Sequence, residues 1–118
     1  MPFPVTTDAA EFGLATHAVP TSLGRVSVHY RRERLARDRG TAVVLLHGAA
    51  GSWSTWTPLL AADRARRASG LPSQLGDVLI PDLPGWGATP RPLGREFTVD
   101  ALVRVVAEIA RALGYERW

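Results

Sequence analysis

The segment VVLLHGAAGSW places four large aliphatic residues directly before a run of residues with little or no side chain. A short apolar run of this kind predicts a strand buried on both faces, as in a parallel sheet. The residues that follow it, His47, Gly48, Ala49, Ala50 and Gly51, leave the space beside the backbone open. In an open α/β sheet such a loop lies at the carboxyl edge, where free amides and the start of a helix favour negative charge. The loop can therefore hold a phosphate or a developing oxyanion.

The residue types in and around the loop distinguish a phosphate site from an oxyanion site. A phosphate-binding P-loop needs GxxxxGK[ST], but the chain contains no lysine, and Gly48 and Gly51 are too close together. The dinucleotide fingerprint GxGxxG is not matched either, because GWGATP has Pro90 where the third glycine is needed. The sequence disfavours a nucleotide site, which leaves an oxyanion site or a simple strand-to-helix turn.

A second motif, DLPGWG, follows the short apolar run of residues 78–80. Its Asp82 can hydrogen-bond the backbone of the turn, and Gly85 and Gly87 permit positive φ or a close approach. Taken alone, this motif is an ordinary turn, so its meaning depends on the first motif.

The elements around both motifs alternate strand and helix. We predict a surface arm over residues 1–14, a hairpin over 16–31, strands over 43–46 and 78–80, and helices over 53–68 and 99–113. This order predicts an α/β fold, in which a mostly parallel sheet with flanking helices carries an N-terminal antiparallel hairpin.

Two of these elements have well-marked faces. Alternation in the second hairpin strand predicts an edge pair with apolar residues on one face (Val26, Val28, Tyr30) and polar residues in water on the other (Arg25, Ser27, His29, Arg31). The last helix has one apolar face (Val99, Leu102, Val103, Val106, Ile109, Ala110, Leu113). We expect Thr98 to cap this helix, Phe97 to pack onto Leu102, and Gly114 to follow its end.

Composition narrows the possible functions. The 118-residue chain has no cysteine, which excludes disulfides, zinc–thiolate sites and thiol nucleophiles. Its net charge of +3 comes from 14 arginines. Five of them fall in RRERLARDR, which predicts a solvated loop, with a nucleic-acid patch as the alternative that no interleaved aromatic residue supports. With no signal peptide and no membrane span, we expect a cytoplasmic protein without metal or cofactor.

A strand ending in HGxxG and, some thirty residues later, a strand ending in DxPGxG resemble the α/β-hydrolase fold superfamily. The resemblance runs from about residue 16 to residue 118, so residues 15–118 are similar to the N-terminal portion of an esterase, lipase, epoxide hydrolase or C–C hydrolase. It implies that Ala49, with Ala50 beside it, gives a backbone N–H to the oxyanion hole, where one donor stabilises the transition state by about 3–4 kcal/mol. It also implies that His47 fixes the loop and is not the general base.

The resemblance further implies a nucleophile in GxSxG, followed by an acid and a histidine. No serine here is flanked in that way, and all three histidines lie at or before position 47, so residues 1–118 contain none of the triad. We expect an N-terminal fragment of a hydrolase acting on a small apolar, ester-like or related substrate. Trp53 and Trp86 line its pocket or pack in the core. The alternative is a non-catalytic small-molecule-binding relic.

Overall fold

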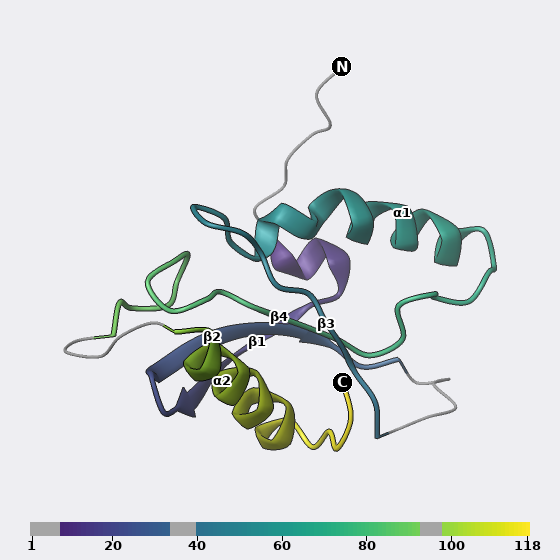
Figure 1. Cartoon of the computed structure of the whole chain (residues 1–118). Helices are drawn as coiled ribbons and strands as arrows, with labels where there is room; N and C mark the ends of the chain where they lie inside the picture. Colours follow the sequence, from purple (N-terminus) through teal and green to yellow (C-terminus); the bar gives the residue numbers. More distant parts are fainter. Residues whose placement is uncertain (1–7, 34–39, 93–97) are drawn as a thin grey trace.

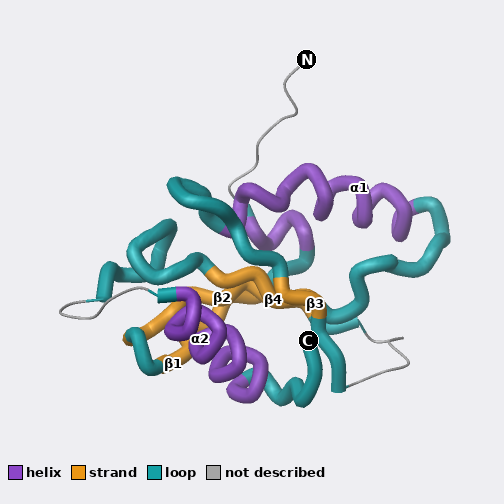
Figure 2. Tube along the Cα trace, viewed as in Figure 1, coloured by secondary structure: helices purple, strands orange, loops and turns teal. Residues whose placement is uncertain are grey.

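The computed structural model of the chain describes residues 8–33, 40–92 and 98–118 (Figure 1). A four-stranded sheet in the order β1-β2-β4-β3 lies between helices α1 and α2, which cover opposite faces (Figures 1 and 2). The elements are the 3₁₀ helices η1 (Ala9–Phe12) and η2 (Trp53–Trp56), the strands β1 (Ala15–Thr21), β2 (Gly24–Arg31), β3 (Val43–Val44) and β4 (Val78–Pro81), and the helices α1 (Thr57–Ala68) and α2 (Val99–Ala112).

The sheet is mixed. Strand β2 pairs antiparallel with both β1 and β4, and only β3 and β4 form a parallel pair of strands in the described part of the chain. A single parallel bridge between Thr41 and Arg117 lies outside these strands. The predicted α/β sheet with flanking helices and an N-terminal antiparallel hairpin is confirmed, and its described part is mixed because the hairpin supplies two of the four strands and joins the sheet through β2.

Strand β3 differs from the predicted strand that is buried on both faces. Val43 and Leu46 are 38% and 37% exposed, and only two residues have strand pairing. The reason is position, since β3 is the outermost strand of the described sheet and has β4 on one side only. Leu45, whose N–H donates to Leu79 O at 2.9 Å, is buried as expected.

Strand β2 also differs from the prediction of an edge strand with a polar face in water. It lies between β1 and β4, so both of its edges are paired, and η2 and α1 contact its polar face. His29 and Arg31 are buried, and Arg31 Nη2 lies 2.8 Å from Asp63 Oδ2 of α1. Alternation predicted the two faces of β2 correctly, but it could not show that a helix covers the polar one.

Two hydrophobic clusters flank the sheet. One contains Val26 and Val28 of β2 together with Val105 and Ile109 of α2. The other gathers side chains from η1, η2, α1 and β4 (Phe12, Leu14, Leu45, Trp53, Leu60, Val78, Ile80). Phe12 and Leu14 are buried, so the described part of the predicted surface arm, residues 8–14, places two side chains in the core while its other residues are exposed or half-buried.

Helix α2 has the predicted ends. Thr98 accepts a hydrogen bond from Ala101 N at 3.0 Å, and Gly114 has a φ of 91° just beyond the helix. Its buried face is shifted, however, since Val99 and Val103 are 77% and 63% exposed while Val105, which the prediction left out, is buried. Phe97 and residues 34–39 of the arginine-rich segment lie outside the described residues.

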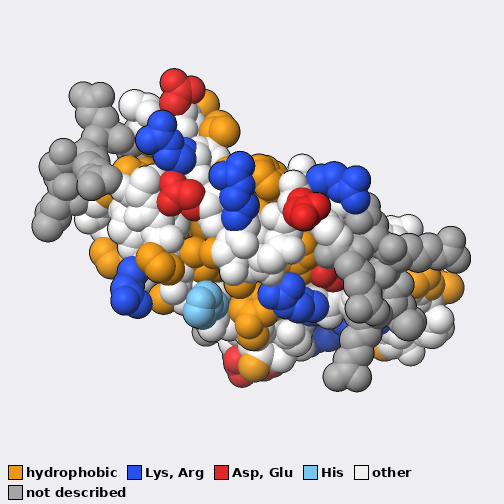
Figure 3. Space-filling model, turned by 90° about the horizontal axis from the view of Figure 1, so that it is seen from below, with side chains coloured by type: hydrophobic (Ala, Val, Ile, Leu, Met, Phe, Trp, Pro, Cys, Tyr) orange, Lys and Arg blue, Asp and Glu red, His pale blue; other side chains and the backbone are white. Residues whose placement is uncertain are grey.

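The surface seen from the α2 side carries basic and acidic side chains that are interspersed with hydrophobic ones (Figure 3). On this face the basic side chains do not gather into one continuous patch. No helix in the described part of the chain is both long and apolar enough to cross a membrane. The same residues contain no group of three or more metal-ligating side chains.

Candidate functional site

Two loops meet at the carboxyl edge of the sheet. The HGAAG loop (residues 47–51) follows β3 and leads to α1 on one face, and the DLPGWG turn (residues 82–87) follows β4 and leads towards α2 on the other (Figures 1 and 2). Neighbouring parallel strands whose connections leave to opposite faces open a crevice at their carboxyl ends. Open α/β sheets bind ligands at this edge.

His47 ties the two loops together. The backbone N–H of Leu83 donates to Nε2 of the buried imidazole at 2.9 Å. Nε2 is thus an acceptor, so the neutral ring carries its proton on Nδ1 and donates it to the carbonyl of Gly48 at 2.7 Å. Both ring nitrogens are engaged in holding loops, so neither is available to take a proton from a nucleophile.

The HGAAG loop contains a tight turn with two alanines at its tip. The N–H of Gly51 donates to Gly48 O at 3.1 Å, which places Ala49 and Ala50 at the two central positions. Ala50 has a φ of 61° and is the one residue other than glycine with a positive φ among those described. The third position of a type II turn demands this conformation, and glycine or asparagine usually supplies it. The backbone is therefore held in a disfavoured conformation at this point.

The two amides at this tip are open. Ala49 and Ala50 are exposed, and within the described part of the chain their N–H groups donate to no protein acceptor. Gly51, in contrast, is closely packed, because a Cβ there would lie 2.7 Å from Thr55 Oγ1. Gly48 has no such neighbour. The loop thus presents two unpaired backbone N–H groups, at Ala49 and Ala50, on a turn whose next residue, Gly51, packs against Thr55.

Asp82 is the second link between the loops. Its carboxylate is buried, at 1% exposure for the residue, and accepts the N–H of Trp53 at 2.7 Å through Oδ1 and that of Ala88 at 3.1 Å through Oδ2. Gly87, with a φ of 53°, packs so tightly on this carboxylate that a Cβ would lie 2.5 Å from its Cγ. Gly85 also has positive φ, at 88°, but meets nothing closer than 3.8 Å.

The two predicted pocket tryptophans lie in different environments. Trp53 is buried in the core, with Phe12 at its edge and a 6.4 Å distance between the ring centroids. Trp86 is exposed at the tip of the DLPGWG turn. Of the two, only Trp86 has the exposure that a ligand-lining side chain needs.

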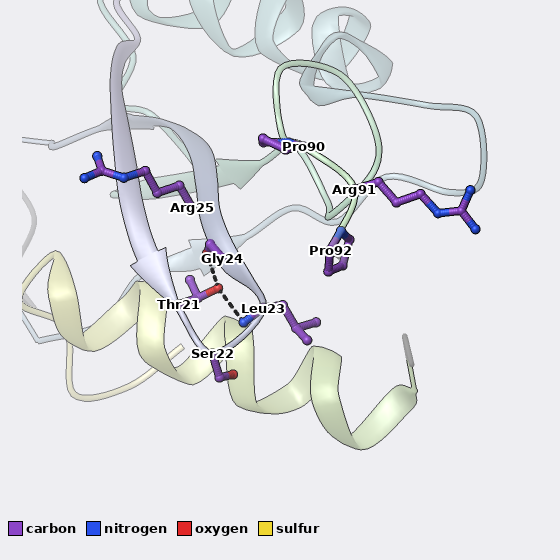
Figure 4. Close-up of a pocket in the computed structure, with 8 residues that line it drawn as sticks. All are labelled: Thr21, Ser22, Leu23, Gly24, Arg25, Pro90, Arg91 and Pro92. Carbon is purple, nitrogen blue, oxygen red and sulfur yellow. Dashed lines mark hydrogen bonds between the residues drawn. The ribbon is translucent and has the colours of Figure 1, made fainter. Parts of the chain in front are cut away.

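A separate groove of about 400 Å³ lies between the β1–β2 turn and the segment after the DLPGWG turn (Figure 4). It is lined by Thr21, Ser22, Leu23, Gly24, Arg25, Pro90, Arg91 and Pro92. None of the site residues predicted from the sequence lines it. The side chains of Arg25 and Arg91 point away from each other, so they do not converge on a common anion (Figure 4).

His29 is the residue that the sequence analysis missed, because it was assigned to a face in water. Its ring packs on Trp53 with 4.9 Å between centroids and an interplanar angle of 31°. Burial lowers the pKa of His29, against the opposing attraction of Asp82. No signal within the hairpin could have shown this, since the covering residues are distant in the chain.

A sequence profile described as the alpha/beta hydrolase family matches residues 43–117, which is more than half of the chain. The chain belongs to this family. The matched residues of this α/β-hydrolase chain include both loops, α1, β4 and α2. The described elements form an incomplete α/β-hydrolase fold.

Individual relatives of this α/β-hydrolase chain are distant. A Stigmatella aurantiaca protein with the name "Putative epoxide hydrolase" is 27% identical over 101 residues, covering 83% of this chain and 22% of that protein. Epoxide hydrolase CorEH, solved without ligand, matches with a TM-score of 0.66 at 24% identity over 87% of this chain and 31% of its own. A bacterial membrane phospholipase A matches with a TM-score of 0.65 at 22% identity over 90% and 30%. The chain therefore spans a third or less of each of these proteins.

Proposed function

We propose that the HGAAG loop is the oxyanion hole of a hydrolase and that the N–H of Ala49 is a donor in it, with Ala50 beside it. One observation carries this proposal: the two exposed amides at the tip of the loop have no protein acceptor within the described residues. The strained φ of Ala50 supports it, because disfavoured backbone conformations persist where the surrounding structure fixes them and cluster at active sites.

The loop contributes electrostatic stabilisation to the reaction. A nucleophile attacks the electrophilic carbon of an ester-like substrate, the electron pair of the carbonyl moves to its oxygen, and the Ala49 N–H stabilises the resulting negative charge. When the carbonyl re-forms, the leaving group departs with its electron pair and takes a proton. In this proposal, the nucleophile, the acid and the catalytic histidine lie in a part of the protein that follows residue 118.

His47, Asp82 and the glycines act by shaping the loop. His47 bonds Leu83 N and Gly48 O, and Asp82 bonds Trp53 N and Ala88 N, so the loop is fixed at its start and just after its end. Gly48, Gly51, Gly85 and Gly87 supply the open or closely packed backbone around these bonds. Pre-organisation of this kind is what makes an oxyanion donor effective, because no reorganisation is needed during the reaction.

The substrate class follows from the family and the composition of the site. An exposed indole, that of Trp86, lies at the same edge of the sheet. We propose a small apolar ester or a related electrophile. The names of the relatives, epoxide hydrolase and phospholipase, apply to those proteins, so the nucleophile in this proposal is either a serine or an aspartate.

The proposal is tested by Ala49→Pro in the chain expressed with its natural continuation. Proline is favoured at the second position of type I and II turns, so this variant keeps the turn and removes only the N–H. With p-nitrophenyl butyrate or styrene oxide as substrate, we expect kcat to fall by about 100- to 1000-fold with little change in KM.

The matched control is Ala50→Gly, which keeps the N–H and fits a positive φ, so its kcat should stay within a few-fold of the wild type. Wild-type kcat in Ala49→Pro would overturn the assignment of the donor. Binding of both substrates without turnover by the unaltered protein would favour the non-catalytic alternative.

A further inference from the structure

His29 lies beneath the junction of the two loops, although no motif marks it. It is 7% exposed on β2, opposite Ile80 of β4, and its ring packs on the indole of Trp53. Trp53 begins η2 and is separated from the HGAAG loop only by Ser52. The imidazole therefore touches the segment that anchors the loop to α1.

One nitrogen of the ring lacks a polar contact. Nδ1 is buried and has no hydrogen-bond partner within the described residues. A proton added at Nδ1 would bury a charge together with an unpartnered donor, and both are costly.

The charged groups around His29 are few. Asp82, after β4, attracts the protonated ring. Arg31 lies two residues further along the same face of β2, and its guanidinium is paired with Asp63 of α1. The neighbours from β1 and η2, Thr16 and Trp53, carry no charge. Burial outweighs the attraction of Asp82 and lowers the pKa of His29, so the ring is neutral at neutral pH.

We propose that His29 is a positioning residue that holds the HGAAG loop through Trp53 only while its ring is uncharged. The backbone N–H of Trp53 bonds Asp82 Oδ1, so His29 contacts the side chain of the same residue whose backbone links the two loops. The importance of His29 for catalysis rests on the proposed function of the HGAAG loop. The structural coupling, by which the charge of His29 affects the loop through Trp53, does not depend on that function.

The coupling is tested by NMR on the ¹⁵N-labelled chain between about pH 7.5 and pH 4.5, a range that spans histidine titration. We expect the amide signals of Gly48, Ala49 and Ala50 to shift with the same midpoint as the ring protons of His29, below the pH of an ordinary histidine. Loop amides that stay unchanged while the His29 ring titrates would overturn the proposal.

Two variants identify the responsible histidine. His29→Gln keeps a polar side chain at this position without the titration, so the shift of the loop amides should disappear. His17→Gln, at an exposed position of β1, should leave it unchanged. A shift that persists in His29→Gln comes from another group and contradicts the proposal. If His29→Gln does not fold, the comparison of midpoints in the wild type still decides.

A second test of the role of His29 measures hydrolase activity in the chain expressed with its natural continuation. His29→Ala removes the contact with Trp53 and should lower kcat by up to about 100-fold, the effect of a catalytic group displaced by roughly 1 Å, with a smaller change in KM. His29→Gln should move the acid limb of the pH profile of kcat. Because the NMR titration needs no turnover, a failed oxyanion assignment leaves that test intact.

Discussion

Trp53 and Asp82 are 29 positions apart in the chain, and the backbone N–H of the first donates to Oδ1 of the second at 2.7 Å. The other carboxylate oxygen accepts the N–H of Ala88. A single buried side chain thus joins the segment after the HGAAG loop to the end of the DLPGWG turn. Since it has no ion-pair partner within the described residues, these backbone amides are what stabilise its charge.

Asp82→Asn is expected to destabilise the fold by about 1–3 kcal/mol, because an amide can accept only one of the two N–H groups and turns a donor towards the other. The urea midpoint of unfolding measures this loss, with an unchanged m-value as the sign that the folded state is intact. Asp100→Asn in the exposed first turn of α2 is the control and should cost no more than about 1 kcal/mol. Equal midpoints for the two variants would contradict the role given to Asp82.

Gly87→Ala should destabilise the protein more than Gly85→Ala. Both positions have positive φ, which costs an L-residue about 1–2 kcal/mol. At Gly87 the new Cβ would also lie 2.5 Å from Asp82 Cγ, whereas at Gly85 the nearest atoms are 3.8 Å away. Thermal unfolding of the two variants separates backbone strain, which they share, from the clash, which only Gly87→Ala has. A lower Tm for Gly85→Ala is the result that this geometry does not allow.

The loops could be predicted from the sequence because their geometry is set locally. Gly85 and Gly87 adopt positive φ, as their places in the turn indicated, and Asp82 does bond the backbone of its own turn through Ala88. Ala50 was harder, since an alanine gives no local sign that it adopts the φ that glycine usually supplies. The neighbouring Gly51 packs closely against Thr55, a contact that the loop sequence does not indicate either.

The environment of β2 could not be predicted because its partners are far away in the chain. Its pairing with β4 joins Tyr30 to Leu79, and only this pairing makes β2 an inner strand. The burial of His29 and Arg31 then follows from the elements packed over that face, η2 and α1. Alternation reports which residues share a face, but not what lies on it.

Stability in alkali depends on Tyr115, whose hydroxyl donates to Asp77 Oδ2 at 2.6 Å. Burial, with Asp77 beside it, raises the pKa of Tyr115 to about 12, whereas the unfolded chain has the ordinary tyrosine value of about 10. The folded state therefore keeps a proton that the unfolded state loses. The stability that this proton contributes is complete below about pH 10 and is lost as the pH rises to about 12.

Few other side chains change their charge between about pH 10 and pH 12, because the chain has no lysine or cysteine and only two tyrosines. Tyr115→Phe should lower the free energy of unfolding at neutral pH and flatten its decline above about pH 10. Tyr30→Phe should keep the decline. Urea unfolding at several alkaline pH values measures both, and a steep decline that survives in Tyr115→Phe would assign it to another group.

Arg31 and Asp63 form a buried ion pair between β2 and α1, at 2.8 Å. Burial raises the pKa of Asp63, but hydrogen bonds from Ser73 and Arg31 outweigh it and leave the pKa below its ordinary value. The pair therefore contributes stability above about pH 4 that is lost as the pH falls through the lowered pKa.

Removing one partner leaves the other charge buried and alone, so Arg31→Met should cost about 3–5 kcal/mol at neutral pH. Because Arg31→Met/Asp63→Leu removes both charges, it should cost less than Arg31→Met alone. The control is Arg67→Met, since Arg67 is largely exposed and lies 3.7 Å from Glu33, an arrangement that contributes about 0–1 kcal/mol. Urea midpoints rank the three variants. If Arg31→Met costs no more than Arg67→Met, the buried pair does not hold α1 to the sheet.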